Sequence, residues 1–240
     1  MKKTLYLFLF LASYSLSAQD STNTNFKHWA VGFTVSPDYC YRTLTSDGSV
    51  GSASVISLRN GSEQAQYGIT SGFNVCYFFK KHFLIETGIN YSDKSYSTKD
   101  FSDFIYSGPP DPSIPSKIKY IYDYNFIDIP LKINVILGKK KLRFIASAGV
   151  VSNILLFKKE IQIAEYSDVT SITSYPTPKT DLNFQGLTAL ISMGTDISLG
   201  KNFNLRIEPV CRYSLALFQT SPVKEHLWSA GLNMGLYYRF

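Results

Sequence analysis

Apolar and polar residues alternate along eight separate segments of the chain, which is typical of strands whose two faces meet different surroundings. In residues 67–79 the odd positions are mostly apolar, whereas the even positions begin with Gly68, Thr70, Gly72 and Asn74. The other seven segments are 29–41, 83–92, 118–137, 142–157, 187–198, 203–215 and 228–240. The pattern therefore predicts an all-β protein of eight strands.

The segment 118–137 changes phase, because its apolar set moves from even positions up to Phe126 to odd positions from Ile127. A β-bulge near Phe126 would keep both sets on one outer face. Pro130 favours irregular pairing there, since proline lacks the donor that a ladder uses. We therefore predict that the aromatic residues before the bulge face outward: Tyr120, Tyr122, Tyr124 and Phe126. Toward the end of residues 142–157 both odd and even positions are apolar, so the pattern does not predict which side chains there face outward.

The connections between these segments alternate in length. Short ones fall at 80–82, 138–141 and 200–202, and longer ones at 43–66, 97–117, 166–182 and 219–226. An up-and-down meander of eight strands then has both termini on the side of the short turns. Short periplasmic turns and longer extracellular loops are the layout of a bacterial outer-membrane barrel.

The polarity of the two faces separates a membrane barrel from a secreted soluble β-domain. In a soluble barrel the aromatic face would fill the interior, but eight strands enclose a space only wide enough for side chains. If that face meets lipid, aromatic residues come to the strand ends, where interfacial girdles lie: Trp29, Tyr77, Phe79, Tyr91, Trp228, Tyr238 and Phe240. We therefore predict an eight-stranded antiparallel transmembrane β-barrel, with the soluble domain as the alternative.

Composition and the N-terminus agree with export. The chain is 45% hydrophobic and 18% charged, which excludes disorder, and no stretch after residue 18 is long and apolar enough for a spanning helix. Lys2 and Lys3 precede an apolar run at 5–12 and small residues at 15–18, as in a secretory signal. We expect a signal peptide at 1–18, cleaved after Ser17 or Ala18, a periplasmic segment at 19–27 and the barrel at 28–240.

Charge points to the lumen rather than to nucleic acid. The formal charge of +6 falls to +4 once Lys2 and Lys3 are removed, and this scattered excess predicts no nucleic-acid partner. Nine charged residues share the small, polar face: Glu86, Asp128, Lys132, Arg143, Asp196, Arg206, Glu208, Arg212 and Arg239. We predict that they neutralise one another as a plug, with Arg206 and Glu208 in one network that Glu86 or Asp196 completes from another strand, because unpaired ions in a narrow lumen lose their hydration. The alternative is a conduction path or proton relay.

The three cysteines match no metal or redox spacing. Antiparallel pairing of Trp29 with Phe79 sets a register whose other pairs are Cys40 with Gly68 and Cys76 with Gly32. The two thiols would then lie too far apart for a disulfide, and Cys211 points to lipid by parity. We predict three free thiols.

Candidate chemistry is sparse. The histidines fall at strand ends or in connections, at His28, His82 and His226, and show no metal-ligand spacing. We therefore expect no catalytic residue, no metal and no cofactor, and no enzyme. A lipid-modifying barrel enzyme is the weaker alternative, since Ser221, Glu225 and His226 lie close in sequence.

Three short motifs point to a family. Asn233, Gly235, Tyr238 and Phe240 resemble the terminal signal that the outer-membrane barrel assembly machinery reads. The segments 86–92 (ETGINYS) and 124–132 (YNFIDIPLK) resemble the third and fourth strands of the PorT-like outer-membrane β-barrel domain. These motifs carry the resemblance, and the strand layout extends it over most of the chain after the signal.

The resemblance implies an outer-membrane protein in contact with lipid, assembled by the barrel machinery. Some PorT-like proteins are linked to a secretion system for adhesins and proteases, so a structural or accessory role with a secretion-system partner is the leading expectation. A surface adhesin or receptor that binds through loops 43–66 and 97–117 is the alternative. The resemblance carries over no catalytic residue.

Deleting Phe240 tests the terminal signal. We expect slower assembly and protease-sensitive periplasmic chain, because the last strand must be recognised before the barrel closes. Pulse-chase labelling with protease accessibility measures this. Normal insertion of the truncated chain would show that the terminal match is a coincidence.

Overall fold

The computed structural model describes residues 26–100, 114–138, 141–166, 169–176, 185–215 and 222–240. The expected signal peptide at 1–18, and most of the segment at 19–27, lie outside the described residues.

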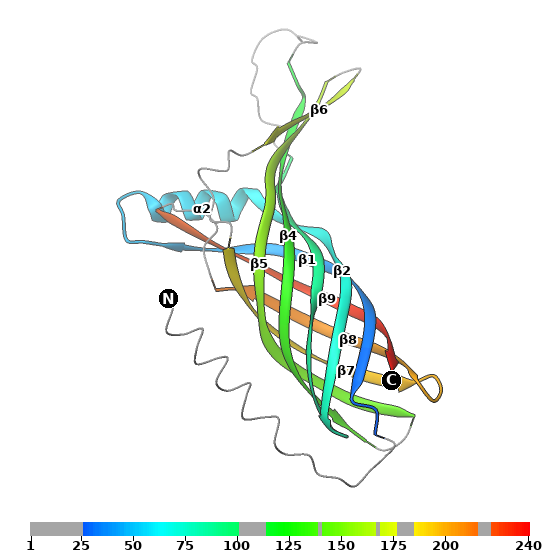
Figure 1. Ribbon diagram of the computed structural model, residues 1–240. Helices are drawn as coiled ribbons and strands as arrows, with labels where there is room; N and C mark the ends of the chain where they lie inside the picture. Colours follow the sequence, from blue (N-terminus) through cyan, green and yellow to red (C-terminus); the bar gives the residue numbers. More distant parts are fainter. Residues whose placement is uncertain (1–25, 101–113, 139–140, 167–168, 177–184, 216–221) are drawn as a thin grey trace.

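Eight of the nine described strands form a closed antiparallel ring (Figure 1). The elements are β1 (Trp29–Ser46), α2 (Ser52–Ser62), β2 (Glu63–Lys80), β3 (Phe83–Thr98), β4 (Lys117–Leu137), β5 (Leu142–Glu165), β6 (Thr170–Pro176), β7 (Gln185–Ser198), β8 (Phe203–Ser214) and β9 (Val223–Arg239). The sheet runs β4-β3-β2-β1-β9-β8-β7-β5, and pairing of β4 with β5 closes it. The predicted eight-stranded barrel is therefore confirmed, and β6 is an addition that pairs with β5. Among the described residues, no helix has the length and apolar character of a membrane span.

The two ends of the barrel differ. The start of β1, the end of β9 and the short connections lie at one end, and α2 and β6 lie at the other (Figure 1). The first two extracellular connections are shorter than predicted, because the strands that flank them extend further than predicted. β1 pairs with β9 as far as Ser46, opposite Val223, and the 11 residues of α2 lie within the expected loop 43–66.

The outer wall is apolar, with aromatic rings in contact at the periplasmic end. Trp29 lies 4.8 Å from Tyr77, and Phe203 lies 5.1 Å from Tyr238, measured between ring centroids. Near the extracellular end, Trp228 contacts Tyr39 at 6.4 Å. These rings form the two belts that the strand-end aromatics predict.

The predicted phase change in β4 is wrong. Even positions face the lumen along the membrane part of this strand, so Tyr124 and Phe126 are buried inside the barrel rather than exposed to lipid. A bulge does occur at this level, between Asn125 and Phe126 in the pairing with β5, but the extra residue is Leu156 of β5. The inward rings pack on residues from other strands. The pattern of apolar positions along a single strand cannot predict this packing.

The predicted register of β1 and β2 is offset by two residues. Trp29 lies opposite Tyr77, not Phe79, so Cys40 faces Gln66 and Cys76 faces Ala30. The long connection through α2 does not fix the register as a tight turn would. An even shift keeps every side chain on its predicted face. All three thiols are free, two buried and Cys211 exposed on the outer wall, as predicted.

A closed ring makes a testable prediction about gel mobility. Fifteen pairs between β1 and β9 seal the barrel, so an unboiled sample should migrate faster than a boiled one and should fractionate with the outer membrane. Equal mobility of the two samples, or recovery in the soluble periplasmic fraction, would contradict the closed membrane barrel.

Candidate functional site: the filled lumen and its outer end

An apolar layer fills the periplasmic part of the lumen. Its members come from six strands and are almost wholly buried: Ala30, Cys76, Phe78, Leu84, Ile136, Ile145 and Tyr237. The inward glycine at Gly32 gives the Tyr237 ring its place, because a Cβ there would overlap the ring. This layer blocks the barrel on its periplasmic side.

The charged centre of the lumen is Glu86, which is fully buried. Its carboxylate lies 2.6 Å from Lys132 Nζ and 3.0 Å from Arg206 Nη1. Tyr237 also donates its hydroxyl to Glu86, at 3.0 Å, and the Arg206 guanidinium stacks 4.0 Å above that ring. The cluster joins β3, β4, β8 and β9 across the lumen. Hydrogen-bonded pairing of this kind offsets the cost of burying the ions.

A second carboxylate extends this cluster. Asp196 on β7 accepts a hydrogen bond from Arg143 Nη2 at 2.5 Å and lies 3.7 Å from Arg206 Nε. Arg206 therefore lies between Glu86 and Asp196, and the predicted lumen plug includes all five of these charged side chains.

Arg206 contacts Glu86 and Asp196, as predicted, but its predicted partnership with Glu208 is wrong. Both side chains do face the lumen, but Glu208 Oε1 accepts hydrogen bonds from Ser147 and Ser192, each at 3.0 Å. Among the ion pairs of the described residues, none includes Glu208. Arg206 and Glu208 are two residues apart on β8 and so face the same side of the sheet. The narrow lumen nevertheless lets the Arg206 side chain pair with Glu86 on β3 rather than with Glu208.

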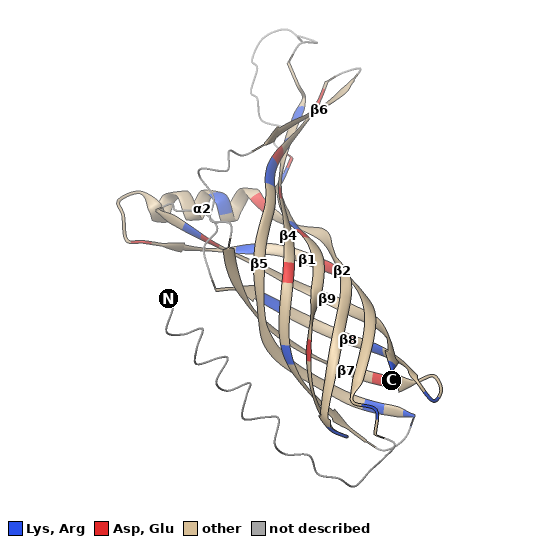
Figure 2. Ribbon diagram, viewed as in Figure 1, with Lys and Arg blue, Asp and Glu red and all other residues tan. Residues whose placement is uncertain are grey.

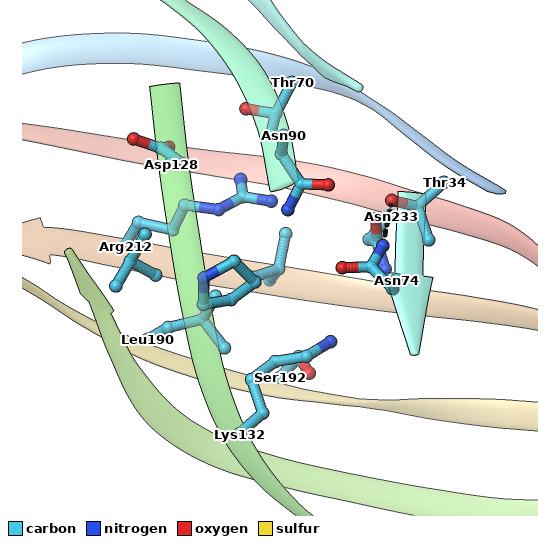
Figure 3. A pocket seen from close by; sticks show the side chains of 13 residues that line it. Thr34, Thr70, Asn74, Asn90, Asp128, Lys132, Leu190, Ser192, Arg212 and Asn233 are labelled. Atoms are coloured by element: carbon cyan, nitrogen blue, oxygen red, sulfur yellow. Dashed lines mark hydrogen bonds between the residues drawn. The ribbon is translucent and has the colours of Figure 1, made fainter. Parts of the chain in front are cut away.

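A small polar cavity lies in the middle of the lumen (Figure 3). Its volume is about 30 Å³, and Thr34, Asn74, Asn90, Lys132 and Arg212 are among the residues that line it. Asn74 donates to the Thr34 hydroxyl at 2.8 Å. A cavity of this volume has room for one or two water molecules.

The lumen holds two further carboxylates, Asp38 and Asp128, and Asp128 also lines this cavity. Asp128 accepts hydrogen bonds from Ser92 at 2.7 Å and Asn153 at 2.5 Å, and Lys94 Nζ lies 3.4 Å away. Asp38 accepts a hydrogen bond from Arg212 at 2.8 Å.

Sequence reasoning missed Asp38 and Lys94 as members of the lumen network. Both stand at even positions, like Gly32 on β1 and Glu86 on β3, so continuing the parity of each strand to its extracellular end would have found them.

Aromatic side chains close the lumen on its extracellular side. Tyr96, Tyr124, Phe126, Leu155 and Leu227 form a second buried cluster. The hydroxyls of Tyr96 and Tyr124 both donate to Glu225 of β9, each at 2.9 Å. The predicted phase change in β4 would have placed Tyr124 and Phe126 in lipid. They instead belong to this cluster, which forms a lid under the extracellular surface.

Helix α2 is joined to this lid by ions. Arg59 donates to Glu63 at 2.6 Å and to Glu225 at 3.0 Å, and Arg42 of β1 donates to Glu63 at 2.7 Å. Burial by itself would lower the pKa of the Arg59 guanidinium, but its hydrogen bond to Glu63 and the nearby oxygens of Tyr96 and Glu225 raise that pKa above its ordinary value. These ion pairs join the helix to the barrel mouth.

The candidate enzymatic residues point in different directions. Glu225 faces the lumen cluster, whereas the His226 ring stacks on Tyr213 and its Nδ1 lies 3.0 Å from the Ser214 carbonyl oxygen. Adjacent residues of a strand project to opposite faces. Ser221 lies outside the described residues. No cluster of metal-ligating side chains occurs in the part of the chain that the structure describes.

The residues of the terminal motif divide between the two faces of β9. Asn233 lines the central cavity and Gly235 packs against Tyr237 and Thr34, whereas Tyr238 and Phe240 stack on the outer wall with ring centroids 6.2 Å apart. Arg239 faces the periplasmic mouth and stacks 3.8 Å above Phe78. The role of the motif in assembly stays a prediction.

A ring of eight antiparallel strands with an apolar wall, aromatic belts and a filled lumen defines an outer-membrane β-barrel. The chain belongs to the outer membrane protein beta-barrel domain family, which it matches over residues 17–221. The protein is thus located in the outer membrane. No curated protein matches the chain.

Several solved structures of small barrels are similar to the chain. Neisserial surface protein A has 12% sequence identity and a TM-score of 0.45, over 88% of this chain and 97% of that chain. OprG from Pseudomonas aeruginosa has 10% identity and a TM-score of 0.44, over 89% and 97%. The attachment invasion locus protein Ail of Yersinia pestis has 10% identity and a TM-score of 0.35, over 88% and 99%.

Replacing Glu86 tests whether the charge cluster stabilises the barrel. Glu86→Gln should lower the free energy of unfolding by about 3–5 kcal/mol, because it leaves Lys132 and Arg206 without a full counter-charge in a dry site. Denaturant titration in detergent micelles measures this. Glu208→Gln is the control and should cost at most about 1–3 kcal/mol, since only two serine hydrogen bonds are affected. Equal losses for the two variants would contradict a stabilising role for the ion pairs.

Proposed function

We propose that this protein is a non-enzymatic, non-conducting outer-membrane barrel that binds a protein partner at the cell surface, in an accessory role. The observation that carries this proposal is a three-stranded blade that extends from the extracellular end of the barrel (Figure 1). The blade consists of the outer ends of β4 and β5 together with β6.

The blade has the chemistry of a docking surface outside the membrane. It carries charged pairs such as Lys117 with Glu165 at 3.8 Å and Lys159 with Asp123 at 3.3 Å, which favour a place in water (Figure 2). On one face, cross-strand pairing brings together four isoleucines: Ile121, Ile161, Ile163 and Ile172. Ile172 has 69% of its surface exposed.

The free edge of the blade adds a second binding feature. All seven residues of β6 are exposed, and within the described residues this strand pairs only with β5. An exposed edge offers backbone donors and acceptors in a row, and an extended segment of another protein can pair with them. Isoleucines beside that edge would supply pockets for alternate side chains of the partner.

The filled lumen supports the non-conducting part of the proposal. Two apolar layers enclose the paired charges, and the central cavity holds only about 30 Å³. The side chains of Glu225 and His226 project to opposite faces of β9, and this arrangement favours a non-enzymatic protein. The resemblance of 86–92 and 124–132 to PorT-like barrels favours a partner that belongs to a secretion system.

Photo-crosslinking in intact cells tests the blade. With a photoreactive residue in place of Ile172, we expect a covalent adduct with a protein, because the side chain lies beside the open edge. The matched control is Ile129 of β4, which is 41% exposed on the lipid-facing wall and should give no protein adduct. Mass spectrometry of the adduct then identifies the partner.

Two further measurements separate the alternatives. Ile172→Lys should reduce the level of a secreted protein if the partner is a secretion substrate, and should leave lipid A mass unchanged. A heat-modifiable barrel that gives no protein adduct at Ile172 would contradict surface binding. Steady conductance of general-porin size in planar bilayers would contradict the closed lumen.

A further inference from the structure

The periplasmic mouth of the barrel is a cavity of about 860 Å³ with a strongly basic lining. Of the ten described residues that line it, six are Lys or Arg and none is Asp or Glu: Lys27, Lys81, Lys141, Arg143, Lys201 and Arg239. Lysines from all three periplasmic turns thus lie on the rim, and two arginines face inward. Figure 2 shows this concentration of blue at the lower end of the barrel, near the C-terminus.

The charges of this mouth are not balanced as those of the lumen are. Deeper in the barrel, Lys132 and Arg212 each face a carboxylate within 3 Å. At the mouth, Arg143 shares Asp196 with Arg206, and Arg239 donates its Nε to the Lys27 carbonyl oxygen at 2.7 Å. Among the described residues, Arg143 Nε and Arg239 Nη2 are buried with no hydrogen-bond partner. A net positive charge therefore remains.

The adjoining sequence does not supply the missing acid. Residues 19–25, which precede Phe26 at the mouth, contain one carboxylate, Asp20. Because no described Asp or Glu lines the mouth, another molecule or solvent ions can supply the counter-charge.

We propose that the periplasmic mouth binds an acidic peptide segment of a periplasmic protein. The cavity is far larger than a single phosphate needs, and its lining combines cations with the Phe26 ring and the Gly138 backbone, which suits a peptide that carries both carboxylates and apolar atoms. Lipid headgroups lie around the outer wall, beside Trp29, whereas Arg143 and Arg239 face the inside of the barrel. This proposal concerns the end opposite the blade, so the two can fail independently.

A binding titration tests the proposal with the full barrel in phosphatidylcholine nanodiscs. The probe is a fluorescent hexaglutamate peptide, with hexaglutamine as the uncharged control, and fluorescence anisotropy is the readout. We expect hexaglutamate to bind at low salt and to weaken as salt rises, because screening reduces the attraction between charges. The triple variant Lys81→Gln, Lys141→Gln and Lys201→Gln should weaken binding about tenfold or more, and these exposed turn residues can change without loss of the fold.

Matched variants and competitors decide the outcome. The triple variant Lys99→Gln, Lys117→Gln and Lys119→Gln removes the same charge from the extracellular end and should leave binding unchanged. Ser198→Glu introduces a carboxylate into the lining and should weaken binding with all six cations in place. The proposal is overturned if wild-type barrel does not bind hexaglutamate, or if both triple variants weaken binding equally. Full displacement by inorganic phosphate at matched ionic strength, or by nanodiscs of phosphatidylglycerol, would overturn it in favour of a phosphate site.

Discussion

The structure depends on one constraint: charged side chains inside a ring of eight strands have too little room to keep their water, so they must satisfy one another. Glu86 meets this constraint with Lys132, Arg206 and Tyr237, which come from three other strands. Lys132 lies on the neighbouring strand β4, whereas the contacts with Arg206 and Tyr237 cross the lumen and join β3 to β8 and β9, which are not its neighbours in the sheet. They therefore hold the cross-section of the barrel as well as neutralising its charge.

The layers above and below this cluster follow from the same constraint. Ion pairs are strongest where water is excluded, and apolar side chains exclude it on both sides. The periplasmic layer around Phe78 and the extracellular layer around Tyr96 and Phe126 enclose the charged middle. A lumen filled in this way is a packed protein core and not a channel. The chemistry that remains available to partners lies at the two ends of the barrel.

Those two ends differ in charge and in shape. At the cell surface, carboxylates and arginines pair around Glu63 and Glu225, α2 is fixed to the mouth, and the blade rises beyond it. At the periplasmic end, lysines from the turns surround an open cavity, and none of the described residues that line it is Asp or Glu. The difference suits a protein that contacts separate partners on the two sides of one membrane.

The sequence by itself determined which face of most strands meets lipid, because the alternation of side chains is a local property of an extended backbone. It placed Glu86, Asp196 and Arg206 inside and Cys211 outside, and it predicted eight strands with unequal connections. The contacts that side chains make across the lumen could not be predicted in this way. Glu86 rather than Glu208 pairs with Arg206, Tyr124 and Phe126 turn inward, and β1 lies two residues from its predicted register on β2. The tertiary structure decided these features, because they depend on the stagger and width of the closed ring, which no single strand encodes.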